Sequence, residues 1–328
     1  MASTMAARIY PALRVPSEVV DLRRLQSRDL EPLLSEEIAV WSTDLDWDFT
    51  KSADLVRRFV DMRSLSGAAL VEDGEAVGYA YYVIEDEKAL IGDIYVRRNW
   101  RTPEREEALL DCCMEGIAAQ AGVRRVESQV MTLERPAGRA LPGPGVSQIF
   151  ERNFMRAEIA DTALAAGMVR RLCYIEKWSS LYQDAAAHLI AAAYAGHVDG
   201  GINDQYRTPA GARRFLRNIV LYPGCGQFCD LASFAAFDAR DGRMCGISLA
   251  SLVSETCGHI TQICVSPAAR GSGIGHELLR QSLLSLQRLD CRAVSLTVTA
   301  SNAGAVRLYE RMGFRTVKRF SALVWDFE

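Results

Sequence analysis

Three glycines at alternate positions in the C-terminal part of the chain form a pattern that can bind phosphate. Gly271, Gly273 and Gly275 follow an apolar run at residues 260–265 and precede a segment with leucine and isoleucine at helical spacing. The N-terminus of a helix presents backbone N–H groups without partners and the positive end of the helix dipole. Glycine lets phosphate oxygens approach those groups, and Arg270 adds a positive charge beside them. The sequence therefore predicts a diphosphate-binding loop at residues 270–275.

Two common phosphate-binding motifs do not fit this loop. A P-loop ends in Gly-Lys-Ser or Gly-Lys-Thr, whereas Gly275 is followed by His276 and Glu277. The dinucleotide fingerprint G-x-G-x-x-G, started at Gly271, requires a glycine where His276 stands.

Two successive patterns resemble motifs of the GNAT superfamily, the GCN5-related N-acetyltransferases that use acyl-CoA. Motif A reads Arg/Gln-x-x-Gly-x-Gly/Ala, and the matching residues are Arg270, Gly273 and Gly275. Motif B reads N-x-x-A-x-x-x-Y-x-x-x-G-F, and the matching residues are Asn302, Ala305, Tyr309, Gly313 and Phe314. Since both patterns occur in the family's order and spacing, the chain is identified as a member of this superfamily.

The resemblance implies acetyl-CoA as the co-substrate and no metal ion. It places the diphosphate on the glycine loop, and it places the pantetheine arm beside the preceding strand as an additional strand. Asn302 can cap the following helix and also contact the cofactor. The residues that the resemblance assigns to the cofactor are Ile263, Cys264, Val265, Arg270, Gly271, Ser272, Gly273, Ile274, Gly275, Asn302 and Tyr309.

Acetyl transfer to an amine also needs groups that polarise the thioester and move protons. The resemblance implies a backbone N–H of Cys264 or Val265 at the thioester oxygen and Tyr309 as the general acid for the leaving thiolate. A tyrosine on a helix can instead serve packing alone. Cys264 is interpreted as a buried apolar residue, with an acyl-cysteine as the less favoured alternative.

The general base is less well defined, because family members often use a glutamate from the strand before the loop. In this chain that strand carries His259 and Gln262. His259 has a side chain that titrates near neutral pH, and Gln262 can order a water molecule. A chain of water molecules without a dedicated base is the alternative.

The acceptor pocket is expected from the segment at residues 196–207 and from the glycine-flanked Cys225. Asp199 and Asp204 can hold an ammonium group, and Tyr206 can stack on the acceptor. Equally, the two acids can be turn and helix-capping residues. The expected acceptor is a small-molecule or peptide amine, and its identity stays open.

The chain contains an internal repeat at an offset of 168 or 169 residues. Residues 91–96 align with 260–265, and residues 124–130 align with 292–298. The repeat predicts two tandem GNAT-like domains, at residues 1–178 and 179–328. In the first copy, Thr102, Glu104 and Glu106 replace the three loop glycines, so its cofactor site is expected to be lost. Aligning Gly167 with Gly313 also puts Ala163 opposite Tyr309.

The order of predicted elements sets the fold class as α/β (α+β). Each copy is expected to contain a mixed, mostly antiparallel sheet flanked by helices, with an Asp-Gly hairpin between two early strands. The expected opening helices lie at residues 29–42 and 49–62 in the first copy, and at 183–195 and 209–220 in the second. Residues 172–178 read as a strand that either closes the first copy or opens the second.

Composition narrows the class of partner. The chain has 328 residues, a formal net charge of −3 and 49% hydrophobic residues, which is typical of a globular protein with real cores. No strong positive field attracts nucleic acid or an anionic membrane, and no apolar run has the length of a membrane span. Nine scattered cysteines suggest reduced thiols, and the expected location is the cytoplasm. A non-catalytic acyl-CoA-binding or scaffolding protein is the rival interpretation, and monomer or homodimer is left open.

Overall fold

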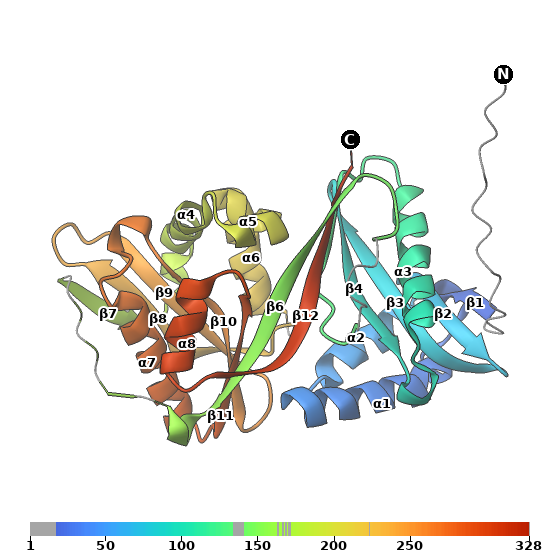
Figure 1. Ribbon diagram of the computed structural model, residues 1–328, viewed down its shortest axis with the longest axis horizontal. Helices are drawn as coiled ribbons and strands as arrows, with labels where there is room; N and C mark the ends of the chain where they lie inside the picture. The colour runs from blue at the N-terminus through green and yellow to red at the C-terminus, as the bar shows by residue number, and fades with distance from the viewer. Residues whose placement is uncertain are drawn as a thin grey trace.

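The computed structural model describes residues 18–133, 141–162, 164, 165, 167, 169, 172–222 and 224–327. In these residues twelve strands form one continuous sheet in the order β1-β2-β3-β4-β5-β12-β6-β11-β10-β9-β8-β7. The strands of the N-terminal half occupy one end of the molecule and those of the C-terminal half the other, with the long strands β6 and β12 between them (Figure 1).

The bounds of the elements are as follows. The strands are β1 (Glu18–Asp21), β2 (Ser66–Glu72), β3 (Glu75–Glu85), β4 (Lys88–Val96), β5 (Arg125–Ser128), β6 (Val146–Glu158), β7 (Cys173–Lys177), β8 (Gln227–Asp238), β9 (Met244–Leu252), β10 (Cys257–Val265), β11 (Ala293–Thr299) and β12 (Arg315–Asp326). The α-helices are α1 (Ser27–Leu45), α2 (Thr50–Asp61), α3 (Pro103–Ala118), α4 (Gln183–Tyr194), α5 (Val198–Ile202), α6 (Pro209–Leu221), α7 (Ile274–Arg288) and α8 (Ala303–Arg311). The 3-10 turns are η1 (Leu22–Arg24), η2 (Arg98–Trp100), η3 (Ile159–Asp161), η4 (Ser180–Tyr182), η5 (Asp204–Arg207) and η6 (Pro267–Ala269).

The pairing of the strands confirms the predicted fold class. β4 pairs with β5 and β10 pairs with β11 in parallel, and the other neighbours in the sheet are antiparallel. The predicted opening helices are present as α1, α2, α4 and α6. Both Asp-Gly hairpins are also present, and Gly74 and Gly242 have φ angles of 83° and 69°, a region that favours glycine at the turn.

Helices cover both faces of each end of the sheet. In the N-terminal half, α1 and α2 pack in one apolar cluster with Ala69 and Tyr79, whereas α3 packs in another with Ala68 and Leu70. Adjacent strand residues point to opposite faces, so the two clusters lie on opposite sides of the sheet. The C-terminal half repeats this arrangement, with α4 and α6 in one cluster and α7 in two others. Both halves therefore have the layers that the repeat predicted.

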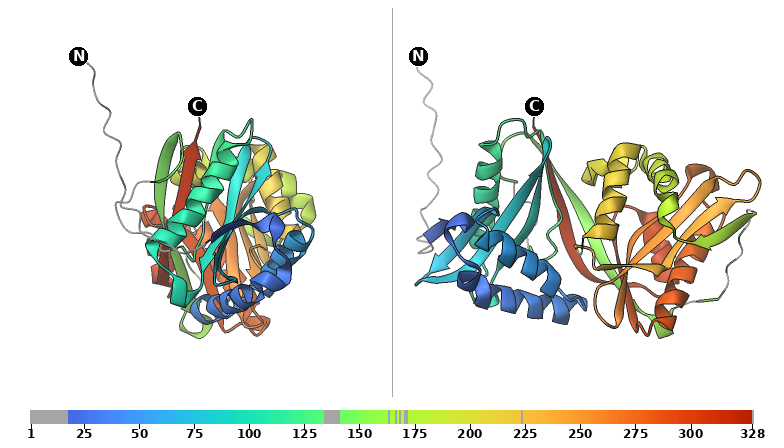
Figure 2. Two further views of the ribbon diagram at one scale, coloured as in Figure 1. Left: turned by 90° about the vertical axis from the view of Figure 1, so that its right-hand side faces the viewer. Right: turned by 180° about the vertical axis from the view of Figure 1, so that it is seen from behind.

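The last strand of each half lies between the two halves and is shared. β6 precedes the C-terminal half in the chain, yet it pairs with β11 from Ala293↔Glu158 to Thr299↔Arg152. β12 comes last in the chain, yet it pairs with β5 in the N-terminal half. β6 and β12 also pair with each other and run side by side in both views of Figure 2. Since each half uses the other's closing strand, the halves are joined by backbone hydrogen bonds as well as by side chains.

The sheet passes from the strands of the N-terminal half to those of the C-terminal half before the predicted boundary at residue 178. β7 pairs with β8, so within the described residues this strand opens the second half of the sheet. The sequence left the place of this strand open, and strand pairing decides it.

The match of Gly167 with Gly313 was wrong. Gly313 precedes β12, whereas Gly167 follows β6, so the two glycines stand on opposite sides of equivalent strands. The counterpart of Gly313 is Gly145, since each precedes its closing strand by one or two residues and each has a positive φ, 97° and 86°. In the order of the chain, the segment between β5 and β6 therefore corresponds to the segment that holds α8. Ala163 and Met168 lie outside the described residues.

Candidate active site

The glycine loop connects β10 to α7 as the sequence predicted. After η6, Gly271 and Gly273 have φ angles of 73° and 89°, which few residues other than glycine adopt. Gly273 is the N-cap of α7, and no side chain caps the helix there. The first N–H groups of α7 therefore point into the loop without a side-chain partner.

β10 and β11 separate beside this loop. They pair in parallel only from Cys257↔Ala293 to Ile260↔Leu296, although both strands continue further. Beyond Ile260, β10 pairs with β9 on its other side, and its register shifts between Ile260 and Gln262. The edge of β10 that faces β11 is thus open at Ile263, Cys264 and Val265. Such an edge can pair with an extended amide chain.

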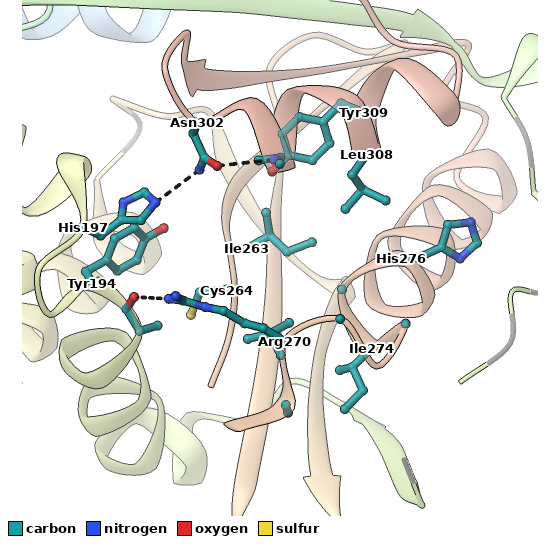
Figure 3. Close-up of a pocket in the computed structure, with 18 of the residues that line it drawn as sticks. Tyr194, His197, Ile263, Cys264, Arg270, Ile274, His276, Asn302, Leu308 and Tyr309 are labelled. Atoms are coloured by element: carbon teal, nitrogen blue, oxygen red, sulfur yellow. Dashed lines mark hydrogen bonds between the residues drawn. The ribbon is translucent and has the colours of Figure 1, made fainter. Parts of the chain in front are cut away.

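A pocket of about 740 Å³ joins the loop to this open edge. Figure 3 shows Ile263 and Cys264 at its centre, with Arg270 on one side and α8 on the other. Its lining residues are Ala193, Tyr194, His197, Ile263, Cys264, Val265, Ala269, Arg270, Gly271, Gly273, Ile274, Gly275, His276, Asn302, Gly304, Ala305, Leu308, Tyr309 and Arg311. Ser272 donates a hydrogen bond to the carbonyl of Ala269 and is not among them. The other residues assigned to the cofactor by sequence therefore line one pocket.

Arg270 holds the loop against α4. Its guanidinium donates to the carbonyl oxygen of Ala193 at 2.5 Å, near the C-terminal end of that helix (Figure 3). The cation thus lies at the negative end of the α4 dipole while it lines the pocket.

Tyr309 lies where this pocket meets a second one. The side chain is 6% exposed, and burial raises the pKa of its hydroxyl. The phenol is therefore protonated at neutral pH, and burial makes it a weaker acid than a free tyrosine. Asn302 begins the same helix by accepting a hydrogen bond from the Ala305 N–H at 3.3 Å.

The second pocket has a volume of about 450 Å³ and lies between the two halves. From the C-terminal half it is lined by residues of α4, α5, η5, β10, β11 and α8, and from the N-terminal half by residues of α1, α2, β4 and the segment after β5. We call it the shared pocket. It has five lining residues in common with the first pocket, namely Tyr194, Ile263, Asn302, Ala305 and Tyr309.

Of the three predicted acceptor residues, two line the shared pocket. Asp199 does so, and its Oδ1 accepts hydrogen bonds from Thr299 and from Arg152, the latter at 3.3 Å. Tyr206 also lines it, stacked on Tyr194 with ring centroids 4.5 Å apart.

Asp204 lies elsewhere. It forms an ion pair of 2.6 Å with Lys88 from the N-terminal half and is not among the residues of the shared pocket. The N–H of Asp204 also donates to Glu127, so the residue ties η5 to β4 and β5. Of the two alternatives left open for Asp204, the turn or helix-capping residue therefore agrees better with the structure than the acid that holds an ammonium group.

The structure argues against His259 as a base. The ring lines the shared pocket, but it is buried between Trp47 and Phe154, and its Nδ1 bonds Ser295 Oγ at 2.8 Å. Burial lowers the pKa of His259 to about 3, so the ring accepts a proton poorly at neutral pH.

The side-chain amide of Gln262 is hydrogen-bonded to two tyrosines. Its amide accepts from Tyr206 at 3.4 Å and donates to the Tyr194 hydroxyl at 3.0 Å. Burial also raises the pKa of the Cys264 thiol to about 12, which argues against an acyl-cysteine.

His197 is a site residue that sequence reasoning did not select. Its Nε2 lies 3.4 Å from Asn302 Nδ2 (Figure 3). Its Nδ1 accepts a hydrogen bond from the Asp199 N–H at 3.2 Å and lies 3.5 Å from Asp199 Oδ2. Because Asn302 Oδ1 accepts from the Ala305 N–H, Nδ2 is the atom that faces the histidine. The sequence shows that His197 precedes Asp199 in the same loop, but it does not show that the ring contacts Asn302 of motif B.

Other residues that the sequence did not select come from the N-terminal half. Trp41, Trp47, Phe49, Tyr81 and Asp93 line the shared pocket. The repeat offers one indication, because Asp93 aligns with Gln262. Within the described residues, no group of three or more His, Cys, Asp or Glu side chains is arranged to hold a metal ion. No helix in the same ranges is both long and apolar enough to cross a membrane.

The comparisons with known proteins agree with this geometry. A model of the acetyltransferase (GNAT) family matches residues 201–314. An uncharacterised N-acetyltransferase of Methanocaldococcus jannaschii is 31% identical over 116 residues, which are 35% of this chain and 68% of that protein. A mycothiol acetyltransferase of Mycolicibacterium gilvum is 37% identical over 92 residues, 26% of this chain. That match spans only 29% of the mycothiol enzyme.

The fold is similar over almost the whole chain to a solved structure. A GCN5-related N-acetyltransferase from Sphaerobacter thermophilus has a TM-score of 0.64 and 19% identity, and the match covers 94% of this chain and 95% of that one. The chain belongs to the GNAT family of N-acetyltransferases. Within that family it is a tandem member, with two GNAT-like halves in one sheet.

Proposed function

We propose that the C-terminal half transfers the acetyl group of acetyl-CoA directly to a primary amine bound in the shared pocket. The observation that carries this proposal is the junction of the two pockets at Tyr309, Asn302 and Ile263. A thioester that enters along β10 and an amine that enters from between the halves meet there. Direct attack in a ternary complex needs this arrangement.

The first pocket suits acetyl-CoA along its length. The N–H groups of α7, with Arg270 beside them, bind the diphosphate. The open edge of β10 pairs with the amide arm, and the backbone N–H of Cys264 or Val265 polarises the thioester carbonyl.

One acidic and one basic side chain prepare the amine. Asp199 faces the shared pocket and holds the ammonium group. His197, whose ring lies between Asn302 and Asp199, accepts the proton that the amine loses. Tyr309 donates its proton to the departing thiolate, and its position at the junction of the two pockets supports this role.

The N-terminal half has no equivalent cofactor site in this proposal. The place of the glycine loop is filled by the ion pair of Arg101 with Glu106, at 3.5 Å, and Glu106 is 4% exposed. Thr102 caps α3 by accepting from the Arg105 N–H, which occupies a donor that a phosphate would need. We place the boundary between the halves at residues 159–172, between β6 and β7, with the closing strands exchanged.

The test is release of CoA thiol from acetyl-CoA over a panel of amines, with Tyr309→Phe beside the wild type. Tyr309→Phe is expected to lower kcat by about 10²–10³-fold while the affinity for CoA stays the same. Tyr182→Phe is the matched control, because its hydroxyl bonds Glu176 far from both pockets. CoA binding without turnover of any amine would support the rival acyl-CoA-binding protein instead. Wild-type kcat in Tyr309→Phe would remove the tyrosine from the mechanism.

A further inference from the structure

The end of the shared pocket that lies in the N-terminal half combines aromatic rings with one acidic group. Trp41, Trp47, Phe49 and Tyr81 line this end together with Asp93. Trp41 stacks on Phe49 with ring centroids 4.8 Å apart, and Trp47 meets Trp41 edge-on at 5.7 Å. The rings therefore form a fixed wall, and Asp93 is the acid that faces the pocket beside it.

Behind Asp93 lies a second carboxyl group, that of Glu37. Glu37 is fully buried and Asp93 is 4% exposed. The two are hydrogen-bonded, with Glu37 donating to Asp93. Tyr79 donates to Glu37 at 2.9 Å, the Trp41 indole donates to it at 3.2 Å, and the Ile94 N–H donates to Asp93 at 2.8 Å. All three of these donors are neutral.

The two carboxyl groups have no positive partner among the described residues. Among the described residues, neither Glu37 nor Asp93 forms an ion pair with lysine, arginine or histidine. Burial raises the pKa of both groups, and the charge of Asp93 raises that of Glu37 further. An uncompensated buried charge is costly, and a bound cation removes that cost.

The aromatic wall and the acid select the same kind of ligand. The faces of tryptophan, tyrosine and phenylalanine attract a cation within about 6 Å, most strongly when it has lost its water. A carboxylate at the same place supplies the neutralising charge. The volume of about 450 Å³ is within the usual range for a small-molecule ligand.

We propose that this end of the shared pocket binds a second positively charged group of the acceptor, remote from the nitrogen that is acetylated. The preferred acceptors are therefore diamines, polyamines or other amines with a second cation. The inference rests on the proposed function of the C-terminal half, and it assigns to the N-terminal half the selection of the acceptor. Asp93 is the specificity-determining residue, and Glu37 positions it.

The test compares 1,5-diaminopentane with pentylamine as acceptors, since the two differ by one terminal ammonium group. The wild type is expected to show kcat/KM at least tenfold higher for the diamine, mainly through KM. Asp93→Asn is expected to remove this advantage, so that kcat/KM for the diamine and for pentylamine lie within twofold of each other in that variant. Glu37→Gln keeps a donor toward Asp93 and should retain the advantage. Asp54→Asn, at an exposed acid on α2 paired with Arg57, should change neither substrate.

The outcomes separate this inference from the proposed function. No thiol release with any amine overturns the proposed function. Release with pentylamine equal to that with the diamine in the wild type overturns the inference alone, and this comparison needs no folded variant. A diamine advantage that survives in an Asp93→Asn protein with wild-type Tm and CoA affinity also overturns it. Turnover of other singly charged amines in preference to the diamine would do the same.

Discussion

Asp93 and Gln262 occupy equivalent positions in β4 and β10, 169 residues apart, and both line the shared pocket. In the C-terminal half this position carries a neutral amide that holds Tyr194 and Tyr206. In the N-terminal half it carries a buried acid. The pseudo-symmetry of the repeat thus brings two equivalent positions, one neutral and one acidic, to one pocket.

Filling the glycine loop should abolish cofactor binding. In Gly275→Glu the new carboxylate would repel the diphosphate and occupy its space at the start of α7, so CoA affinity should fall at least 100-fold. Isothermal calorimetry measures both the affinity and the stoichiometry. The wild type should bind one CoA per chain, because the N-terminal half has Thr102, Glu104 and Glu106 in place of the loop glycines. Glu104→Ala, at the equivalent loop of the N-terminal half, is the control and should leave both quantities unchanged. Two CoA per chain would refute the loss of the first site.

Removal of His197 should produce a defect that depends on pH. Without a base the enzyme can use only amine that is already deprotonated, so His197→Ala should lower kcat/KM about 100-fold at pH 7. The free-base fraction of an alkyl amine rises about tenfold per pH unit below its pKa near 10. The deficit should therefore narrow between pH 7 and pH 9 in steady-state assays. His188→Ala, at an exposed position of α4, serves as the control. A deficit that is constant across this range would assign His197 a structural role.

Asp199 and Asp204 should differ in their effect on turnover when each is changed to asparagine. Asp199→Asn removes the acid that faces the shared pocket, so kcat/KM for the acceptor should fall about 30-fold or more. It also removes the charge paired with the partly buried Arg152, so Tm should fall as well. Asp204→Asn breaks the 2.6 Å ion pair with Lys88 but leaves Lys88 its second partner, Glu127. The expected cost is about 1–2 kcal/mol of unfolding free energy, with kcat/KM within threefold of wild type. Denaturant unfolding and initial rates test both variants, and a large KM effect in Asp204→Asn would restore its predicted role at the acceptor.

His259 should make the fold less stable in mild acid. Its folded-state pKa of about 3 lies below the unfolded value near 6.5, so below pH 6.5 the unfolded chain takes up a proton that the folded chain does not. Stability from this residue is complete above pH 6.5 and falls by about 2 kcal/mol between pH 6.5 and pH 5. Denaturant unfolding of wild type and His259→Gln measures the difference in pH slope.

The comparison with His259→Gln is needed because Glu37 and Asp93 act in the opposite direction. Their folded-state pKa values are raised, so their contribution to stability is present at low pH and is lost as the pH rises above about 4. His259→Gln and the wild type share that contribution, so it cancels when their pH slopes are compared. Equal slopes for the two proteins would show that His259 is protonated in the folded state.

The sequence by itself determined the family, the glycine loop and a repeat with helices on both faces of its sheet. These features rest on local rules, since the glycines at 271 and 273 need positive φ, the apolar periods fix the helices and strands, and the Asp-Gly pairs fix the hairpins. Each of these patterns lies within one continuous segment of the chain. The spacing between motif A and motif B alone indicates the position of Tyr309 relative to the glycine loop.

Only the tertiary structure decided which residues line the shared pocket and how the halves join. The exchange of β6 and β12 depends on pairing between strands far apart in the chain, which no local pattern encodes. Likewise His197 meets Asn302, Asp204 meets Lys88, and Asp93 reaches the shared pocket only when the two halves pack together. Burial and distance between distant segments set these roles, so a pattern of residue types could name the candidates but not assign them.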